Sequence, residues 1–349
     1  MPILPSLRRV TVTFAGHAAL LMFLEVLPLA AQTALTGAGA TFPAPIYQKW
    51  FNDYQSVGNV QINYQPNGSG GGIKSVTEGT VDFGASDMPL TDAQLQTYKT
   101  AHGYNILLFP TVLGADVPTY NVPGVTQQLN FTPEVLAGIF LGKIKTWNDP
   151  AIAKDNPGVK FPGDNIVVVH RSDGSGTTFC WTDYLSKVSS EWSSKVGKNT
   201  SVDWPTGLGA KGNDGVAGMI KQQKGSLGYV ELIYAVRNHL PYGKVRNRSG
   251  EFVKADLQSV SAAAGALKSM PADFRVSITD ESGKGVYPIS TFTWLLIPEK
   301  ISDPTKRSAL IGFLKWAITT GQNSVESLDY ARLPQQVVAK EENAIALIK

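Results

Sequence analysis

Short runs of β-branched and aromatic residues alternate along this chain with stretches whose apolar residues recur at helical spacing. The helical spacing is clearest over residues 46–54 and 181–188, where one face of each predicted helix would be buried against a sheet. Strands that alternate with amphipathic helices are typical of α/β proteins. The predicted strands are residues 60–64, 81–85, 106–112, 166–170, 227–230 and 292–297.

Proline and glycine mark where these elements are expected to end. They cluster at residues 117–124, 155–164 and 282–288, which we predict to be connections rather than parts of strands or helices. The last stretch, residues 328–349, predicts a helix that closes the chain on the surface.

The first 31 residues have the three parts of a secretory signal peptide. Arg8 and Arg9 form the basic end, residues 10–29 form a largely apolar run, and two alanines follow at positions 30 and 31. We therefore predict export and removal of residues 1–31. The remaining residues 32–349 exceed what one hydrophobic core usually organises, so two lobes are expected.

Three further observations limit the class of protein. Glu25 and Pro28 shorten the apolar run below the ~20 residues of a spanning helix, which disfavours a retained membrane anchor. The only cysteine, Cys180, allows no intrachain disulfide and no lipid anchor at the processing site. The net charge of +3 comes without a basic stripe, which argues against nucleic acid or a membrane surface as partner. We expect a monomer. Because its net charge is small, recognition of an anion would depend on a few local residues.

Three loops rich in glycine and hydroxyl groups each precede a predicted helix. They are residues 37–45, where Thr41 is placed to cap the helix, residues 67–72 with Ser69, and residues 171–178. Each loop alone favours simple helix capping. In an open α/β sheet, however, such loops converge at the carboxyl ends of the strands, where helix N-termini bind anions. Together they predict one shared oxyanion site.

Asp87 follows the predicted strand 81–85 and has two interpretations. It caps a helix that begins near Leu90, or it faces the anion. An ionised aspartate only accepts hydrogen bonds, so it suits an anion that carries a proton. Phosphate carries one near neutral pH and sulfate does not. Asp87 therefore favours phosphate over sulfate or molybdate, and arsenate stays open.

Several blocks of this sequence resemble the phosphate-binding protein of the bacterial high-affinity phosphate ABC transporter, a Pst-type substrate-binding protein. This resemblance implies a type II periplasmic binding protein, with two α/β lobes joined by two crossing hinge strands near residues 111–116 and 288–293. It places lobe I at residues 32–114 and 288–349, and lobe II at 115–287. The blocks are residues 37–45, 81–89, 141–147, 171–178, 204–215 and 228–231.

The resemblance also implies a ligand cage, a location and partners. Inorganic phosphate would bind in the periplasm and pass to the permease and ATPase subunits of an ABC importer. Arg171 would supply the positive charge and Asp173 would hold it in place. Asp116, near the first crossing, departs from the family's pattern. The implied phosphate-binding residues are Ala40, Thr41, Phe42, Ser69, Asp87, Arg171, Asp173, Ser175, Gly176 and Thr177.

A phosphate-ester hydrolase is the main alternative from another class. It would need a nucleophile with a base, or a metal. Neither Ser69 nor Ser175 has nucleophile-elbow spacing, and no P-loop or metal-ligand cluster occurs. His170 is the one histidine near the site, and we interpret it as a strand residue. We therefore predict a binding protein with no cofactor and no metal. The other histidines are His17, His102 and His239.

Overall fold

The strands of this protein form from the apolar runs of the sequence, and most of them join one sheet. The computed structural model describes Met1 and residues 32–349, so the predicted signal peptide lies, apart from Met1, outside the described residues. In residues 32–349 eight strands pair in the order β2-β1-β3-β11-β4-β8-β6-β7. They are β1 Thr33–Gly39, β2 Val60–Gln65, β3 Phe83–Ser86, β4 Ile106–Asn121, β6 Val167–Arg171, β7 Leu208–Ala210, β8 Ser226–Glu231 and β11 Ser290–Pro298.

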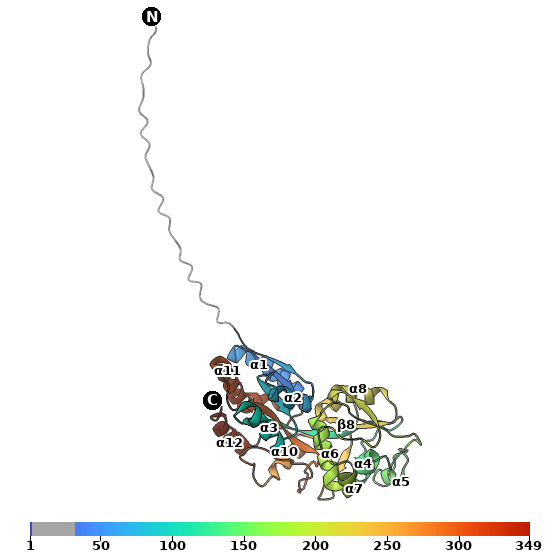
Figure 1. Ribbon diagram of the computed structural model, residues 1–349. Coiled ribbons are helices and arrows are strands. Elements are labelled where there is room, and N and C mark those ends of the chain that lie inside the picture. The colour runs from blue at the N-terminus through green and yellow to red at the C-terminus, as the bar shows by residue number, and fades with distance from the viewer. Residues whose placement is uncertain (2–31) are drawn as a thin grey trace. The chain divides into compact units, whose positions relative to one another are not determined.

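β4 links the two halves of this sheet (Figure 1). Residues 106–115 of β4 pair antiparallel with β11, and residues 116–121 pair antiparallel with β8. Beyond β11, β1 lies parallel to β2 and to β3, while beyond β8, β6 lies parallel to β7 and to β8. Each half is thus a lobe with its own set of strands, and the predicted α/β class is confirmed.

The prediction that residues 117–124 form a connection is wrong, because β4 continues to Asn121. Pro118 prompted that prediction, since proline cannot donate to a strand ladder. The carbonyl of Pro118 accepts the N–H of Gly243 at 2.9 Å, on the edge away from β8. In an antiparallel strand the nitrogen and carbonyl of one residue face the same neighbour. The missing N–H therefore removes no bond between β4 and β8.

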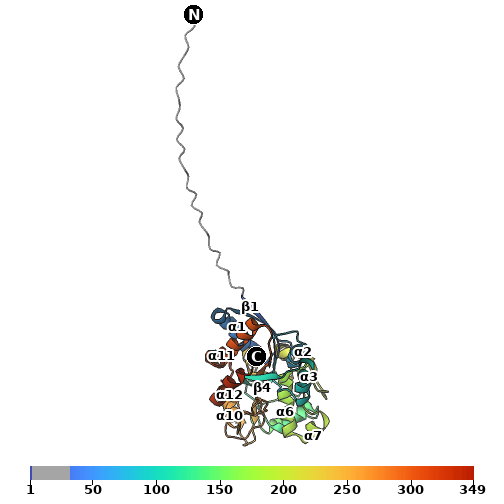
Figure 2. The same cartoon turned by 60° about the vertical axis from the view of Figure 1, so that its left-hand side comes forward.

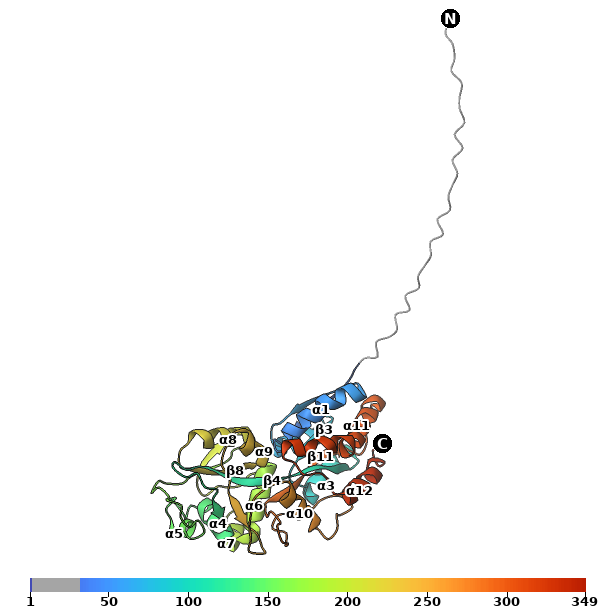
Figure 3. The same ribbon diagram turned by 180° about the vertical axis from the view of Figure 1, so that it is seen from behind.

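Helices cover both faces of each half of the sheet. On one half, α1 and α11 lie on one side and α2 and α3 on the other (Figure 2). On the other half, α8 lies on one side of β8, and α4 and α6 lie on the opposite side (Figure 3). The bounds are α1 Ala44–Gly58, α2 Ser69–Thr77, α3 Asp92–His102, α4 Pro133–Phe140, α5 Pro150–Ala153, α6 Gly176–Val188, α7 Ser190–Lys195, α8 Gly212–Gln222, α9 Leu232–Arg237, α10 Leu257–Gly265, α11 Pro304–Ile318 and α12 Gln335–Ile345.

The predicted helical faces are buried as expected, except that Val188 at the end of α6 is only partly buried. Ile46, Trp50 and Tyr54 on α1 are buried, as are Trp181 and Leu185 on α6. The predicted C-terminal helix over residues 328–349 is shorter: a 3₁₀ helix spans Thr320–Leu328, and α12 begins only after the proline at position 334. No helix in residues 32–349 combines the length and apolar character needed to span a membrane. A small second sheet contains β5 Asn130–Phe131, β9 Lys244–Arg246 and β10 Phe252–Val253.

Two of the predicted glycine loops are more ordered than expected. Residues 37–39 belong to β1, and residues 70–72 lie inside α2, which begins at Ser69. A Cβ added at Gly37 would lie 2.2 Å from the ring of Phe83, so this glycine is needed for close packing inside the sheet. Composition alone does not separate a glycine that packs tightly from one that turns the chain.

Candidate functional site

The backbone of residues 40–42, between β1 and α1, is fixed by three tyrosine hydroxyls. Because a trans peptide places its N–H opposite its carbonyl, the N–H groups of residues 41 and 42 point away from the tyrosines that bind residues 40 and 41. Peptide bonds in the described residues are all trans. The hydrogen bonds run from Tyr64 to the Ala40 carbonyl at 2.7 Å, from Tyr234 to that of Thr41 at 2.5 Å and from Tyr330 to that of Phe42 at 2.6 Å.

Thr41 does not cap α1, which corrects that prediction. The cap position belongs to Pro43, where no side chain makes a capping bond. The Thr41 hydroxyl oxygen instead accepts from the side-chain amide of Asn213 at 2.9 Å. Its own proton stays available for a bound anion, because an amide nitrogen cannot accept.

Ser69 opens α2 and connects the two halves of the protein. Its hydroxyl oxygen accepts the N–H of Asp87 at 3.1 Å and the N–H of Gly176, the first residue of α6, at 3.0 Å. The side chain is fully buried. Ser69 therefore lies where the start of α2, the end of β3 and the start of α6 converge.

Arg171 ends β6, and Asp173 holds its guanidinium in a two-bond fork. Arg171 Nε lies 2.8 Å from Asp173 Oδ1, and Nη2 lies 2.5 Å from Oδ2. Burial raises the pKa of Asp173, but the hydrogen bond and charge of Arg171 outweigh it and leave that pKa below its usual value. Arg171 Nη1 also donates to the Thr177 hydroxyl at 3.3 Å. The predicted contact between Arg171 and Asp173 is confirmed.

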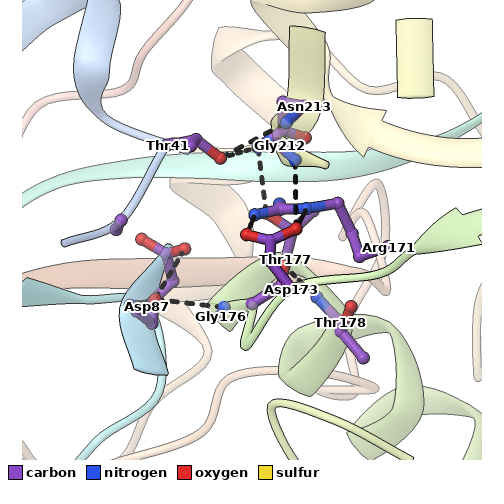
Figure 4. A network of polar contacts seen from close by, with 12 residues as sticks. Thr41, Asp87, Arg171, Asp173, Gly176, Thr177, Thr178, Gly212 and Asn213 are labelled. Carbon is purple, nitrogen blue, oxygen red and sulfur yellow. Dashed lines mark hydrogen bonds and ion pairs between the residues drawn. The ribbon is translucent and has the colours of Figure 1, made fainter. Parts of the chain in front are cut away.

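The N-terminus of α6 completes this part of the site (Figure 4). Ser175 is its N-cap, and its hydroxyl oxygen accepts the N–H of Thr178 at 3.0 Å. A Cβ added at Gly176 would lie 2.5 Å from both Asp87 Oδ2 and the Ser69 hydroxyl oxygen. Only glycine lets α6 approach that closely. The helix N-terminus, which carries a partial positive charge, thus faces Asp87.

Asp87 does not cap a helix, because α3 begins after its own N-cap, Thr91. It is 1% exposed, and its Oδ1 accepts from the Thr293 hydroxyl at 2.7 Å. Burial raises the pKa of Asp87 to about 7, although the hydrogen bond from Thr293 and the charge of Arg171 oppose that shift. The second interpretation of Asp87, as an acceptor in the site, agrees with this geometry.

The net formal charge of this site is small, because the carboxylates of Asp173 and Asp87 offset the charge of Arg171. Fixed N–H and hydroxyl dipoles and helix N-termini therefore add to the attraction that Arg171 exerts on an anion. This donor-rich arrangement, with a single acceptor side chain facing it, suits an anion that still carries a proton.

Sequence reasoning missed two residues that join these parts. Asn213, near the start of α8, donates to Thr41 at 2.9 Å and to Thr177 at 3.1 Å, so it bridges the two lobes (Figure 4). Thr293, on β11, binds Asp87. The Lys-Gly-Asn-Asp-Gly run at 211–215 resembles the other glycine-polar loops and was a usable signal. Thr293 lies inside an apolar run, so the sequence around it carried no signal of a functional role.

Two observations concern the metal and the base that a phosphate-ester hydrolase would need. No group of three His, Cys, Asp or Glu side chains in residues 32–349 is arranged to hold a metal ion. His170 stacks on Trp204 with ring centroids 4.7 Å apart, and burial lowers its pKa. The predicted site residues lie instead around one hydrogen-bonded network between the lobes.

Comparison with known proteins identifies the family. Residues 28–320 match the family described as the PBP superfamily domain. The phosphate-binding protein PstS of Pasteurella multocida is 46% identical over 312 residues, which cover 89% of each chain. PstS of Xylella fastidiosa is 44% identical over 320 residues, covering 90% of this chain and 86% of the relative.

A solved structure supports the fold. A high-affinity periplasmic phosphate-binding protein (PfluDING) bound with phosphate has a TM-score of 0.73 and is 21% identical, covering 89% of this chain and 93% of that one. At this identity the likeness concerns the fold alone, and it confirms the predicted periplasmic binding protein architecture. The chain therefore belongs to the PBP superfamily and, within it, to the family of the phosphate-binding proteins PstS.

Proposed function

We propose that this protein binds one inorganic phosphate ion between its two lobes and delivers it to a membrane ABC phosphate importer. Membership of the PstS family supports this function. The single observation that carries it is Asp87, a buried acceptor that faces the donor-rich start of α6. A protonated phosphate can donate to Asp87, whereas sulfate has no proton to offer.

The proposed cage takes donors from both lobes. Arg171 supplies the charge and Asp173 orients it, while Asp87 accepts the phosphate proton. The remaining contacts would be hydroxyls and backbone N–H groups, and Ala40 would only border the cage because its N–H donates to the Ala85 carbonyl at 3.0 Å. The full set is Ala40, Thr41, Phe42, Ser69, Asp87, Arg171, Asp173, Ser175, Gly176 and Thr177.

Loading and delivery follow from this division of donors. Neither lobe alone completes the cage, so phosphate would bind the closed form more tightly and shift the population toward it. We propose lobe I at residues 32–114 and 288–349 and lobe II at 115–287. The loaded protein would be a periplasmic monomer, freed of residues 1–31 and without a lipid anchor. It would dock on the importer's permease, whose ATPase drives transport, and would catalyse no reaction itself.

Calorimetric titration of the phosphate-stripped protein tests this function. We expect one-to-one phosphate binding at neutral pH and two units higher, and no sulfate response at the higher pH, where Asp87 is ionised, because a buried acceptor can reject an analogue without the donor by ~10⁴-fold or more. The variant Asp87→Asn should bind sulfate, since its amide can donate. Absence of phosphate binding to the unaltered protein would reject the proposal. Arsenate, protonated like phosphate, should compete.

A further inference from the structure

Thr293 occupies a special position on the strand β11. The pairing of β11 with β4 shifts by one residue between Thr293 and Trp294, because Thr293 faces Val112 whereas Trp294 faces Pro110. Thr111 is thus the extra, bulged residue of β4. Bulges commonly redirect side chains next to functional sites. Here the irregularity lies beside the contact between Thr293 and Asp87.

Three buried hydroxyl groups make hydrogen bonds around this bulge, and the donor in each bond can be assigned. The Thr111 hydroxyl donates to the Thr293 carbonyl at 3.2 Å, and its oxygen lies 2.8 Å from the Tyr47 hydroxyl. Since Thr111 uses its proton on that carbonyl, Tyr47 is the donor in their contact. The Thr293 hydroxyl donates to Asp87 Oδ1 at 2.7 Å. These side chains are buried, so water does not compete for the bonds.

We propose that Thr293 is a positioning residue for anion discrimination: its hydroxyl stabilises the ionised Asp87 carboxylate through Oδ1, and Oδ2, which the Ser69 hydroxyl reaches only at 3.5 Å, remains the acceptor for a protonated oxyanion. This inference rests on the proposed phosphate-binding function. Oδ2 is the oxygen nearest a Cβ built at Gly176, and so it faces the start of α6. A protonated Asp87 would instead donate, and sulfate could then accept from it.

The surroundings of Asp87 make the Thr293 contact the main stabiliser of the charged form. Burial raises the pKa of Asp87, and the Thr293 hydrogen bond opposes this most strongly, ahead of Arg171 and Ser69. Among the described residues, Arg171 is the cation whose charge favours the ionised form of Asp87. The other titratable groups that interact electrostatically with Asp87 have raised pKa values and remain neutral to higher pH than usual. They are Tyr47, Tyr64, Asp116, Cys180, Glu231, Tyr234 and Tyr330.

The test compares three variants with the unaltered protein. Thr293→Val removes the hydroxyl at nearly constant shape, and Thr293→Ser restores it. Thr291→Val is the matched control, because the Thr291 hydroxyl is also buried on β11 but donates to the Phe292 carbonyl rather than to Asp87. Phosphate and sulfate affinities are measured by calorimetry from pH 5.5 to 9. Sulfate does not titrate in this range, so its profile reports the protein.

We expect sulfate binding to the unaltered protein to appear only as the pH falls through about 7, the pKa of Asp87. A hydrogen bond to a charged group is worth enough to move this transition by about one to two pH units. Thr293→Val should therefore bind sulfate at pH 8, while Thr293→Ser and Thr291→Val should reject it there. Circular dichroism confirms folding, and Thr293→Ala replaces Thr293→Val if the latter unfolds.

An unchanged sulfate profile in Thr293→Val, with phosphate binding intact, would overturn the role of Thr293. An equal shift in Thr291→Val would also overturn it, because any buried hydroxyl of β11 would then suffice. Failure of the unaltered protein to bind phosphate would instead reject the proposed function, so the two failures are distinguishable.

Discussion

The protonation of Asp87 should make the stability of the ligand-free protein depend on pH. Burial raises the pKa of Asp87 from its ordinary value of 3.8 to about 7. Between these values the folded protein holds a proton that the unfolded chain has released. The contribution of Asp87 to stability is therefore complete below about pH 4 and is lost as the pH rises through 7. The variant Asp87→Asn does not titrate and removes this dependence.

The size of the effect follows from the two pKa values. They differ by about 3 units. One pKa unit corresponds to about 1.4 kcal/mol, so the loss in stability is on the order of 4 kcal/mol. Asp116, Glu231 and Glu341 are also buried with raised pKa values and add slopes of the same sign. These three groups are present both in the unaltered protein and in Asp87→Asn. Their slopes therefore largely cancel in the difference between the two free energies of unfolding.

Urea unfolding of the phosphate-stripped protein and of Asp87→Asn, each at pH 4, 5, 6, 7 and 8, measures this difference. Phosphate must be removed, since any ligand of the folded state adds stability. The free energy of unfolding of the variant minus that of the unaltered protein should rise by about 4 kcal/mol from pH 4 to pH 8, mostly below pH 7.

Parallel pH curves for the two proteins would refute this reasoning. They would mean that Asp87 keeps an ordinary pKa, and so that the buried surroundings described here do not control its charge. A difference that falls as the pH rises would mean that Asp87 is ionised more readily in the folded state than in the unfolded chain.

Three further predictions concern the site and the hinge. Arg171→Ala should weaken phosphate binding by roughly 2–5 kcal/mol in calorimetry, as for other lost buried charge partners, and an unchanged affinity would remove Arg171 from the site. Gly176→Ala should cost about 1–3 kcal/mol of phosphate affinity because its Cβ would meet Asp87 and Ser69, whereas Gly218→Ala, whose Cβ would touch nothing, should bind as the unaltered protein does. Asp116→Val should raise the free energy of unfolding by about 1–3 kcal/mol at pH 7, since no N–H or O–H group in residues 32–349 bonds to either carboxyl oxygen and the Cys180 thiol beside it is a weak donor; urea unfolding that shows a loss would contradict this.

Local chemistry could be predicted from the sequence wherever it depends on neighbours along the chain. The Arg171–Asp173 fork joins residues two positions apart, and Ser175 caps the helix that follows it directly. The burial of one face of α1 follows from spacing alone. In each case the partners are close in sequence, so few conformations compete.

Other features depend on pairing between distant segments. The continuation of β4 past Pro118 depends on which edge of the strand faces β8. Asn213 meets Thr41 across 172 positions, and Thr293 meets Asp87 across 206. No local preference encodes such contacts, because they exist only once the sheet order is set and the two lobes meet. The sequence by itself therefore determined the α/β class, the buried face of α1 and the local contacts at Arg171 and Ser175. Only the tertiary structure decided which side chains join the lobes and which hydroxyl controls Asp87, since a hydrogen bond requires its two atoms to lie within about 3 Å.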